Sequence, residues 1–378
     1  MISKNSVLII VIIGFILPSV SFQLYTLIIA TLLIIQNKFK FKFTLNSILI
    51  IFFLIITICH FLIHNHIEDF SESLRIIYIL IIATASLNKS YNHKILLSIR
   101  FVSFTLFLSV LFQWIYSYSD FWNKFVGILY SENHYSSGLN KLAPRAMGYM
   151  SNIIEAGFLF FSSICVALYR LSNRQNKLDF FYLFLSLTGL LLTQSKTLIL
   201  IGIISFVFYL IYNWKSNKLI IISVAMILFY LTDFFLDTFS QIERLKVDGI
   251  QTSSFEARKE VWRNMIDINL YNSNFFEKLF GVGRGSFAQI YGDITPDSDF
   301  FYILNQFGLF GILLSIIFLI ININIIIKSR SIYYSLFIVL SIISSFFIDL
   351  FTSVKVLFMI FIMSNYFKDE GRICMRKL

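Results

Sequence analysis

Long apolar runs separated by short polar breaks dominate this chain. A run such as "LSIIFLIININIII" at 314–327 lacks the apolar and polar alternation of a barrel strand. Runs near 20 residues match the roughly 30 Å hydrocarbon core of a bilayer, and helices satisfy their own backbone groups there. The pattern predicts an all-α polytopic bundle of about twelve membrane-spanning helices, near 6–20, 22–36, 46–63, 74–87, 95–116, 150–169, 178–193, 197–212, 219–236, 299–327, 332–348 and 354–367.

The first run resembles a secretory signal, because Lys4 precedes the apolar stretch "SVLIIVIIGFIL". No small-residue cleavage site follows Pro18, and another apolar run begins at once. We therefore interpret residues 6–20 as an uncleaved first span.

Composition agrees with a membrane protein. Only 14% of the residues are charged, whereas a soluble domain carries roughly a quarter. The three cysteines lie far apart, which indicates isolated thiols.

The net charge of +10 needs no nucleic acid as a partner, because basic residues gather in short segments on one side of the membrane. By the positive-inside rule that side is the cytoplasm and holds both termini. The basic residues counted there include Lys38, Lys40, Lys42, Lys89, Lys94, Arg170, Arg174, Lys177, Lys215, Lys218, Lys328 and Arg330.

This orientation leaves two long segments outside, 117–149 and 237–298. No repeat or low-complexity linker divides the chain, so residues 1–378 are interpreted as one integral membrane domain. The second segment contains an expected amphipathic helix near 254–270. Its helix opens with the capping-box pattern Ser253-x-x-Glu256. We expect the chemistry to lie where the two segments meet the outer membrane surface.

The stretch "GVGRGS" at 281–286 has three possible roles. A dinucleotide site requires a strand before it and a βαβ context, neither of which is predicted here. A flexible turn is the simple alternative. The third role is a phosphate site, in which the glycines let backbone amides and Arg284 approach an anion.

Other charged residues lie near the same outer surface. In the helix near 254–270, Arg258 shares an apolar stripe with Trp262, so it either snorkels or points at an anion, whereas Arg263 lies on the polar stripe. Glu155 either pairs with Arg145 or lines a polar cavity with it, and Asn152 lies one helical turn before Glu155. Lys196, in an outer turn, is either an anion ligand or an interfacial lysine.

The span near 299–327 opens with polar residues on one face, namely Asp299, Tyr302 and Gln306. Asp297 and Asp299 either cap the helix or act as a general base. His60, His64 and His66 with Glu68 and Asp69 do not form a closed ligand set, so we expect no metal site.

Five segments in order, "PRAMGYMSNIIEAG", "LLTQSKTLIL", "EARKEVWRNM", "LFGVGRGSF" and "DSDFFYILNQFGLFGILL", resemble the O-antigen polymerase and O-antigen ligase superfamily of bacterial membrane glycosyltransferases. Ligases typically carry a histidine where this chain has Asp297-Ser298-Asp299, which favours the polymerase branch. Relatives often have arginine at the position of Lys196.

The resemblance implies a GT-C-like architecture in the bacterial inner membrane, without a metal or other cofactor. The donor would be a growing glycan on undecaprenyl pyrophosphate, and the acceptor a single repeat unit on the same lipid. Basic residues would bind the donor, with Asn152 and Tyr302 as further substrate ligands and Asp299 or Glu155 aiding the attacking hydroxyl. A chain-length regulator protein is a further partner that the resemblance allows. The basic residues are Arg145, Lys196, Arg258, Arg263 and Arg284, of which Arg258 is also a catalytic candidate.

Two alternatives from other classes stay open. A transporter of a lipid-linked oligosaccharide would also have about twelve spans and interior arginines, although transporters often show repeat-related halves. A structural membrane protein would leave Arg258 and Glu155 without a role.

Overall fold

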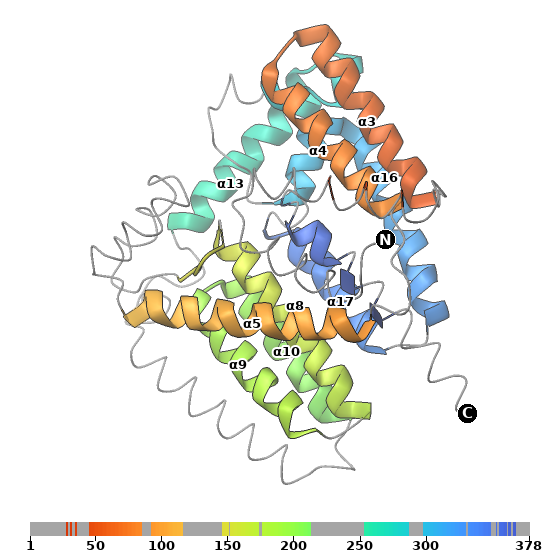
Figure 1. The fold of residues 1–378 in the computed structure, drawn as a ribbon. Helices are drawn as coiled ribbons and strands as arrows, with labels where there is room; N and C mark the ends of the chain where they lie inside the picture. Colours follow the sequence, from red (N-terminus) through yellow and green to blue (C-terminus); the bar gives the residue numbers. More distant parts are fainter. Residues whose placement is uncertain are drawn as a thin grey trace.

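A computed structural model describes residues 45–84, 92–115, 146–150, 152–173, 176–212, 253–286, 298–329, 332–348 and 355–360, with a few single positions elsewhere (Figure 1). Throughout these ranges the regular elements are helices. They are α3 (Leu45–His64), α4 (Ile67–Thr84), α5 (Asn92–Ile115), α8 (Ile153–Asn173), α9 (Lys177–Thr193), α10 (Lys196–Tyr212), α13 (Ser253–Ile266), the π-helix η2 (Asp267–Asn272), α14 (Phe275–Phe280), α16 (Asp299–Ser329) and α17 (Ile332–Ser345).

The helices agree with the predicted all-α membrane class. Four are long and apolar enough to cross a bilayer, with spans at Ser47–His64, Lys94–Ile115, Ile153–Asn173 and Asp299–Ile321. Two shorter apolar helices lie at Lys196–Tyr212 and Ile332–Ser345. The count of twelve spans stays a prediction, because most of the first two spans and the span near 219–236 lie outside the described residues. Both termini, nearly all of segment 117–149 and parts of segment 237–298 lie outside them as well.

One predicted loop is helical instead. The sequence pattern places a hydrophilic loop before a span that begins at residue 74, but α4 already begins at Ile67. Only a tight turn at Asn65, with φ of 55°, separates α4 from α3. Acidic residues at 68 and 69 suit the first turn of a helix because its N-terminus carries partial positive charge. The polar stretch is therefore the first part of α4.

The lower half of Figure 1 is a bundle of α5, α8, α9, α10 and α17. Its core contains Phe158, Phe161 and Phe337, which are buried and in mutual ring contact. At the end that the charge pattern assigns to the cytoplasm, the buried carboxylate of Asp179 on α9 accepts hydrogen bonds from Arg100 of α5 and Arg170 of α8. These ion pairs join the ends of three helices.

The upper half of Figure 1 contains α3, α4 and α13, and α16 packs against them. Ile56, Ile76 and Phe307 form a small core between α3, α4 and α16. The ring of Trp262 on α13 stacks on Phe301 of α16, with centroids 5.0 Å apart. On α13, Met265 is buried while Glu260 and Arg263 are exposed, as expected for an amphipathic helix.

A close backbone approach joins the 281–285 loop to α16. The helical path of α16 is interrupted at Gly308, which has φ of 62° and ψ of −157°. Gly281 lies beside this break, and the Val282 amide donates a 2.9 Å hydrogen bond to the Asn305 carbonyl. A β-carbon at Gly281 would lie 2.5 Å from the backbone carbon of Gln306, so the two segments meet only through glycine.

We expect Gly281→Ala to destabilise the protein. The residue has φ of 85° and ψ of 171°, a backbone region essentially restricted to glycine, and such a strained conformation costs another residue roughly 1–3 kcal/mol before the backbone clash is counted. Gly202→Ala is the matched control, because its β-carbon would meet only side-chain ends, Leu190 closely and Ile164 at an ordinary contact distance, and no backbone atom. Thermal unfolding in detergent, followed by tryptophan fluorescence, should show a lower midpoint for Gly281→Ala. Equal midpoints would contradict the close approach.

Candidate functional site

The glycine loop, residues 281–285, binds a carboxylate of the protein itself. The backbone amides of Arg284 and Gly285 donate hydrogen bonds of 2.8 and 3.1 Å to one oxygen of Asp69 on α4. Gly283 has φ of 78°, and a β-carbon at Gly285 would clash with His66 at 2.2 Å. Successive amides that point at one anion form a nest. The amides that the phosphate-site alternative would offer to an external anion are therefore bonded to Asp69.

Glu72, one turn further along α4, lies between two arginines. Its side chain is fully buried. One carboxylate oxygen accepts a 2.9 Å hydrogen bond from Nε of Arg75, and the other accepts a 3.2 Å bond from Arg284. The Arg284 side chain is 48% exposed, so most of its five N–H donors remain available on the outer side.

The start of α16 completes this cluster. Arg75 donates a 3.0 Å hydrogen bond to the Tyr302 hydroxyl, and its guanidinium carbon lies 5.3 Å from the centre of the Tyr302 ring. Asp299 is 2% exposed and interacts electrostatically with Arg75. We call Asp69, Glu72, Arg75, Arg284, Asp299 and Tyr302 the outer charge cluster. It contains three carboxylates and two guanidinium groups.

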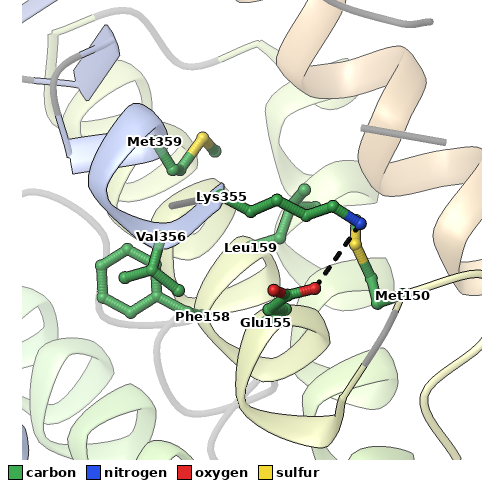
Figure 2. Close-up of a pocket in the computed structure, with 7 residues that line it drawn as sticks. All are labelled: Met150, Glu155, Phe158, Leu159, Lys355, Val356 and Met359. Carbon is green, nitrogen blue, oxygen red and sulfur yellow. Dashed lines mark ion pairs between the residues drawn. The ribbon is translucent and has the colours of Figure 1, made fainter. Parts of the chain in front are cut away.

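Glu155 belongs to a separate group at the start of α8 (Figure 2). One of its oxygens lies 3.6 Å from Nζ of Lys355, and the other accepts a 2.7 Å hydrogen bond from Ser353. Both charged side chains are buried, with exposed fractions of 5% and 3%. Met150, Phe158 and Met359 are among the residues that enclose a small cavity here, with room for one water molecule at most. The partner expected for Glu155, Arg145, lies outside the described residues.

The remaining candidates lie on other elements. The Asn152 side chain accepts a 2.7 Å hydrogen bond from the Glu155 amide, as a cap of α8 does. Lys196 begins α10, and Arg263 is exposed on α13. Arg258 lies one turn before Trp262 in α13, and its side chain lies outside the description. Thus Arg284, Asp299 and Tyr302 share one site, while Glu155 and Asn152 occupy another.

Asp69, Glu72 and Arg75 are the functional candidates that the sequence interpretation missed. They recur every three residues, so they lie along one face of α4. Buried charges in folded proteins are paired, so charges at that spacing indicate a shared partner. The assignment of residues 64–73 to a loop hid this signal. Among the described residues, no group of three acidic, histidine or cysteine side chains is arranged to hold a metal ion.

Comparison with known proteins gives one match. Residues 181–316 match the model of a family described as O-antigen ligase. Neither a curated protein nor a solved structure matches the chain significantly. The matched stretch runs from α9 into α16 and includes α13, the glycine loop, Asp299 and Tyr302. It supports a relationship with the O-antigen ligase and polymerase superfamily, and it does not distinguish the two branches.

Proposed function

We propose that the protein is a surface-polysaccharide polymerase. It joins oligosaccharide repeat units carried on undecaprenyl pyrophosphate by glycosyl transfer at the outer face of the bacterial inner membrane. The observation that supports this most is the family match across α13, the glycine loop and the start of α16. That stretch contributes three of the six residues of the outer charge cluster.

Within the cluster, Arg284 is the group that suits a pyrophosphate leaving group. Planar guanidinium groups bind phosphate oxygens with two parallel hydrogen bonds. Arg284 is fixed on one side by Glu72 and presents its remaining donors outward. Arg258 and Arg263 lie on α13, which Trp262 stacks against α16 beside Asp299. In our proposal these three arginines hold the donor and stabilise the negative charge that develops on its pyrophosphate.

The branch is proposed from the residues before α16. Ligases typically carry a histidine there, whereas this chain has Asp297-Ser298-Asp299. An O-antigen ligase is the second candidate, because the matching family model carries that description.

The test uses purified protein in detergent with chemically defined undecaprenyl-pyrophosphate repeat units, and products are resolved on a gel. We expect a ladder of glycans. Loss of one electrostatic contact to a transition state typically lowers kcat by about 10²–10³-fold, so Arg284→Ala and Arg258→Ala should lose the ladder. Lys259→Ala, beside Arg258 on an exposed part of α13, is the matched control and should retain it.

Three other outcomes would overturn the proposal. A single transfer to a lipid A–core acceptor without a ladder would identify a ligase. Movement of the intact lipid across a vesicle bilayer without transfer would identify a transporter. A ladder that survives both arginine variants would place the pyrophosphate elsewhere.

A further inference from the structure

A second charge cluster lies at the end of the helix bundle that the charge pattern assigns to the cytoplasm. It consists of Arg100 on α5, Arg170 on α8 and Asp179 on α9, and both arginines donate hydrogen bonds to the Asp179 carboxylate. The arginine side chains are 14% and 22% exposed, and that of Asp179 is 1% exposed. Two largely buried guanidinium groups therefore share one buried carboxylate, which leaves the cluster with a net charge of +1.

Acidic side chains are scarce at this end. Of the 21 acidic residues in the chain, the predicted topology places only Asp179, Asp369 and Glu370 on this side. The last two belong to the C-terminal tail, outside the described residues. Basic residues are frequent there, and Lys177, two positions before Asp179, is exposed. Because buried charges in folded proteins are paired, the excess positive charge indicates an anion from outside the described residues.

Tyrosine rings place this cluster at the level of the membrane surface. The Tyr182 ring centre lies 5.3 Å from the guanidinium carbon of Arg100. Tyr169 on α8 makes edge-to-face contacts with Tyr333 and Tyr366, whose ring centres lie 6.1 and 6.3 Å away. Tyrosines are enriched at membrane–water interfaces, at the level of the lipid headgroups. The arginines therefore lie at the depth where a lipid phosphate is found.

We propose that this cluster binds the headgroup of an anionic phospholipid in the cytoplasmic leaflet. A guanidinium carries five N–H donors, and phosphate oxygens accept them in parallel pairs. Basic pockets between membrane helices on the cytoplasmic side are typical sites for anionic headgroups. Asp179 holds the two guanidinium groups together, and the charge of +1 balances one anionic lipid. The site is separate from the outer charge cluster and does not depend on the proposed glycosyl transfer.

The test measures lipid binding to the full chain in detergent by native mass spectrometry, with phosphatidylglycerol and phosphatidylethanolamine in equal amounts. We expect one saturable phosphatidylglycerol per chain, bound in preference to phosphatidylethanolamine. A basic side chain near the membrane surface strengthens anionic lipid binding by about fivefold, so Arg170→Gln should weaken phosphatidylglycerol binding by that factor. This variant leaves Asp179 paired with Arg100. Lys259→Gln, on α13, is the control and should bind like wild type.

Asp179→Asn separates a lipid site from a purely structural ion pair. It retains both arginines and raises the charge of the cluster to +2. Phosphatidylglycerol should therefore bind at least as tightly as in wild type, and it should raise the thermal unfolding midpoint. An Asp179→Asn protein that gains neither binding nor stability from this lipid would contradict the proposal.

Three further results would also overturn it. A wild type that binds both lipids equally, or an Arg170→Gln variant that keeps the full preference, would show that the cluster does not select the lipid. Inorganic phosphate that stabilises the protein as much as phosphatidylglycerol does would identify a soluble anion. A lipid preference that appears only in Asp369→Asn/Glu370→Gln would identify the C-terminal tail as the anion.

Discussion

Glu72→Ala should be one of the most destabilising single substitutions in this protein. The change leaves Arg75, whose side chain is 12% exposed, without its main counter-charge. Removing one partner of a buried ion pair typically costs about 3–5 kcal/mol, because the remaining charge stays away from water. The Arg284 contact contributes less, because a half-exposed guanidinium is screened by solvent. We therefore attribute most of the loss to Arg75.

The measurement is the unfolding midpoint in detergent, with Glu68→Ala as the matched control. Glu68 lies on the same turn of α4 but is exposed. Glu68→Ala should unfold close to the wild-type temperature, and Glu72→Ala far below it. If the two variants unfold together, Glu72 does not hold α4, the glycine loop and α16 in place. If Glu72→Ala does not accumulate, the shape-conserving Glu72→Gln serves instead and should also unfold early.

Lys355→Ala should have an effect of similar size in the other half of the molecule. Glu155 is 5% exposed and forms an ion pair with Lys355. Its buried carboxylate would then lose that counter-charge, and breaking a buried ion pair typically costs about 3–5 kcal/mol. The Ser353 hydroxyl satisfies one oxygen but does not neutralise the group.

The double variant Glu155→Gln/Lys355→Met tests the cause of that loss. Replacing a buried ion pair by neutral side chains of similar size is often nearly neutral, so the double variant should recover most of the stability lost in Lys355→Met alone. A double variant as unstable as the sum of its single variants would show that the pair does not interact. An activity assay distinguishes a structural role of Glu155 from a catalytic one. If Glu155 aids the attacking hydroxyl, the stable double variant should still lose its product ladder.

The sequence predicted those features of the fold that depend on a single helix. Apolar runs placed α8, α9, α10, α16 and α17 within a few residues of their observed bounds, because a membrane helix satisfies its own backbone and needs only a continuous apolar stretch. The resemblance also pointed to the stretch that the family model later matched. Arg284, Asp299 and Tyr302 were selected there and lie in one cluster.

What the sequence could not give depends on contacts between distant segments. The sequence offered the glycine loop as a candidate anion site, but the group that its amides bind, Asp69, lies 215 residues earlier in the chain. Glu155 was expected to pair with Arg145 or to line a polar cavity with it, whereas the structure places Lys355, 200 residues further along the chain, beside it. The spacing of residues along one helix shows which face of that helix is buried, but it does not show which other helix packs on that face. The break in α16 at Gly308 could not be predicted either, because it depends on the loop at Gly281 that packs against it.

The 212 residues between Glu72 and Arg284 also impose an order on biosynthesis. A ribosome adds about 5–20 residues per second, so the α3–α4 hairpin is made roughly 10–40 s before the loop that completes its charges. Throughout that interval Glu72 has Arg75 of the same hairpin as an ion-pair partner, whereas Asp69 still lacks the backbone amides of the glycine loop. The completion of this charge cluster is therefore a late step in the assembly of the protein.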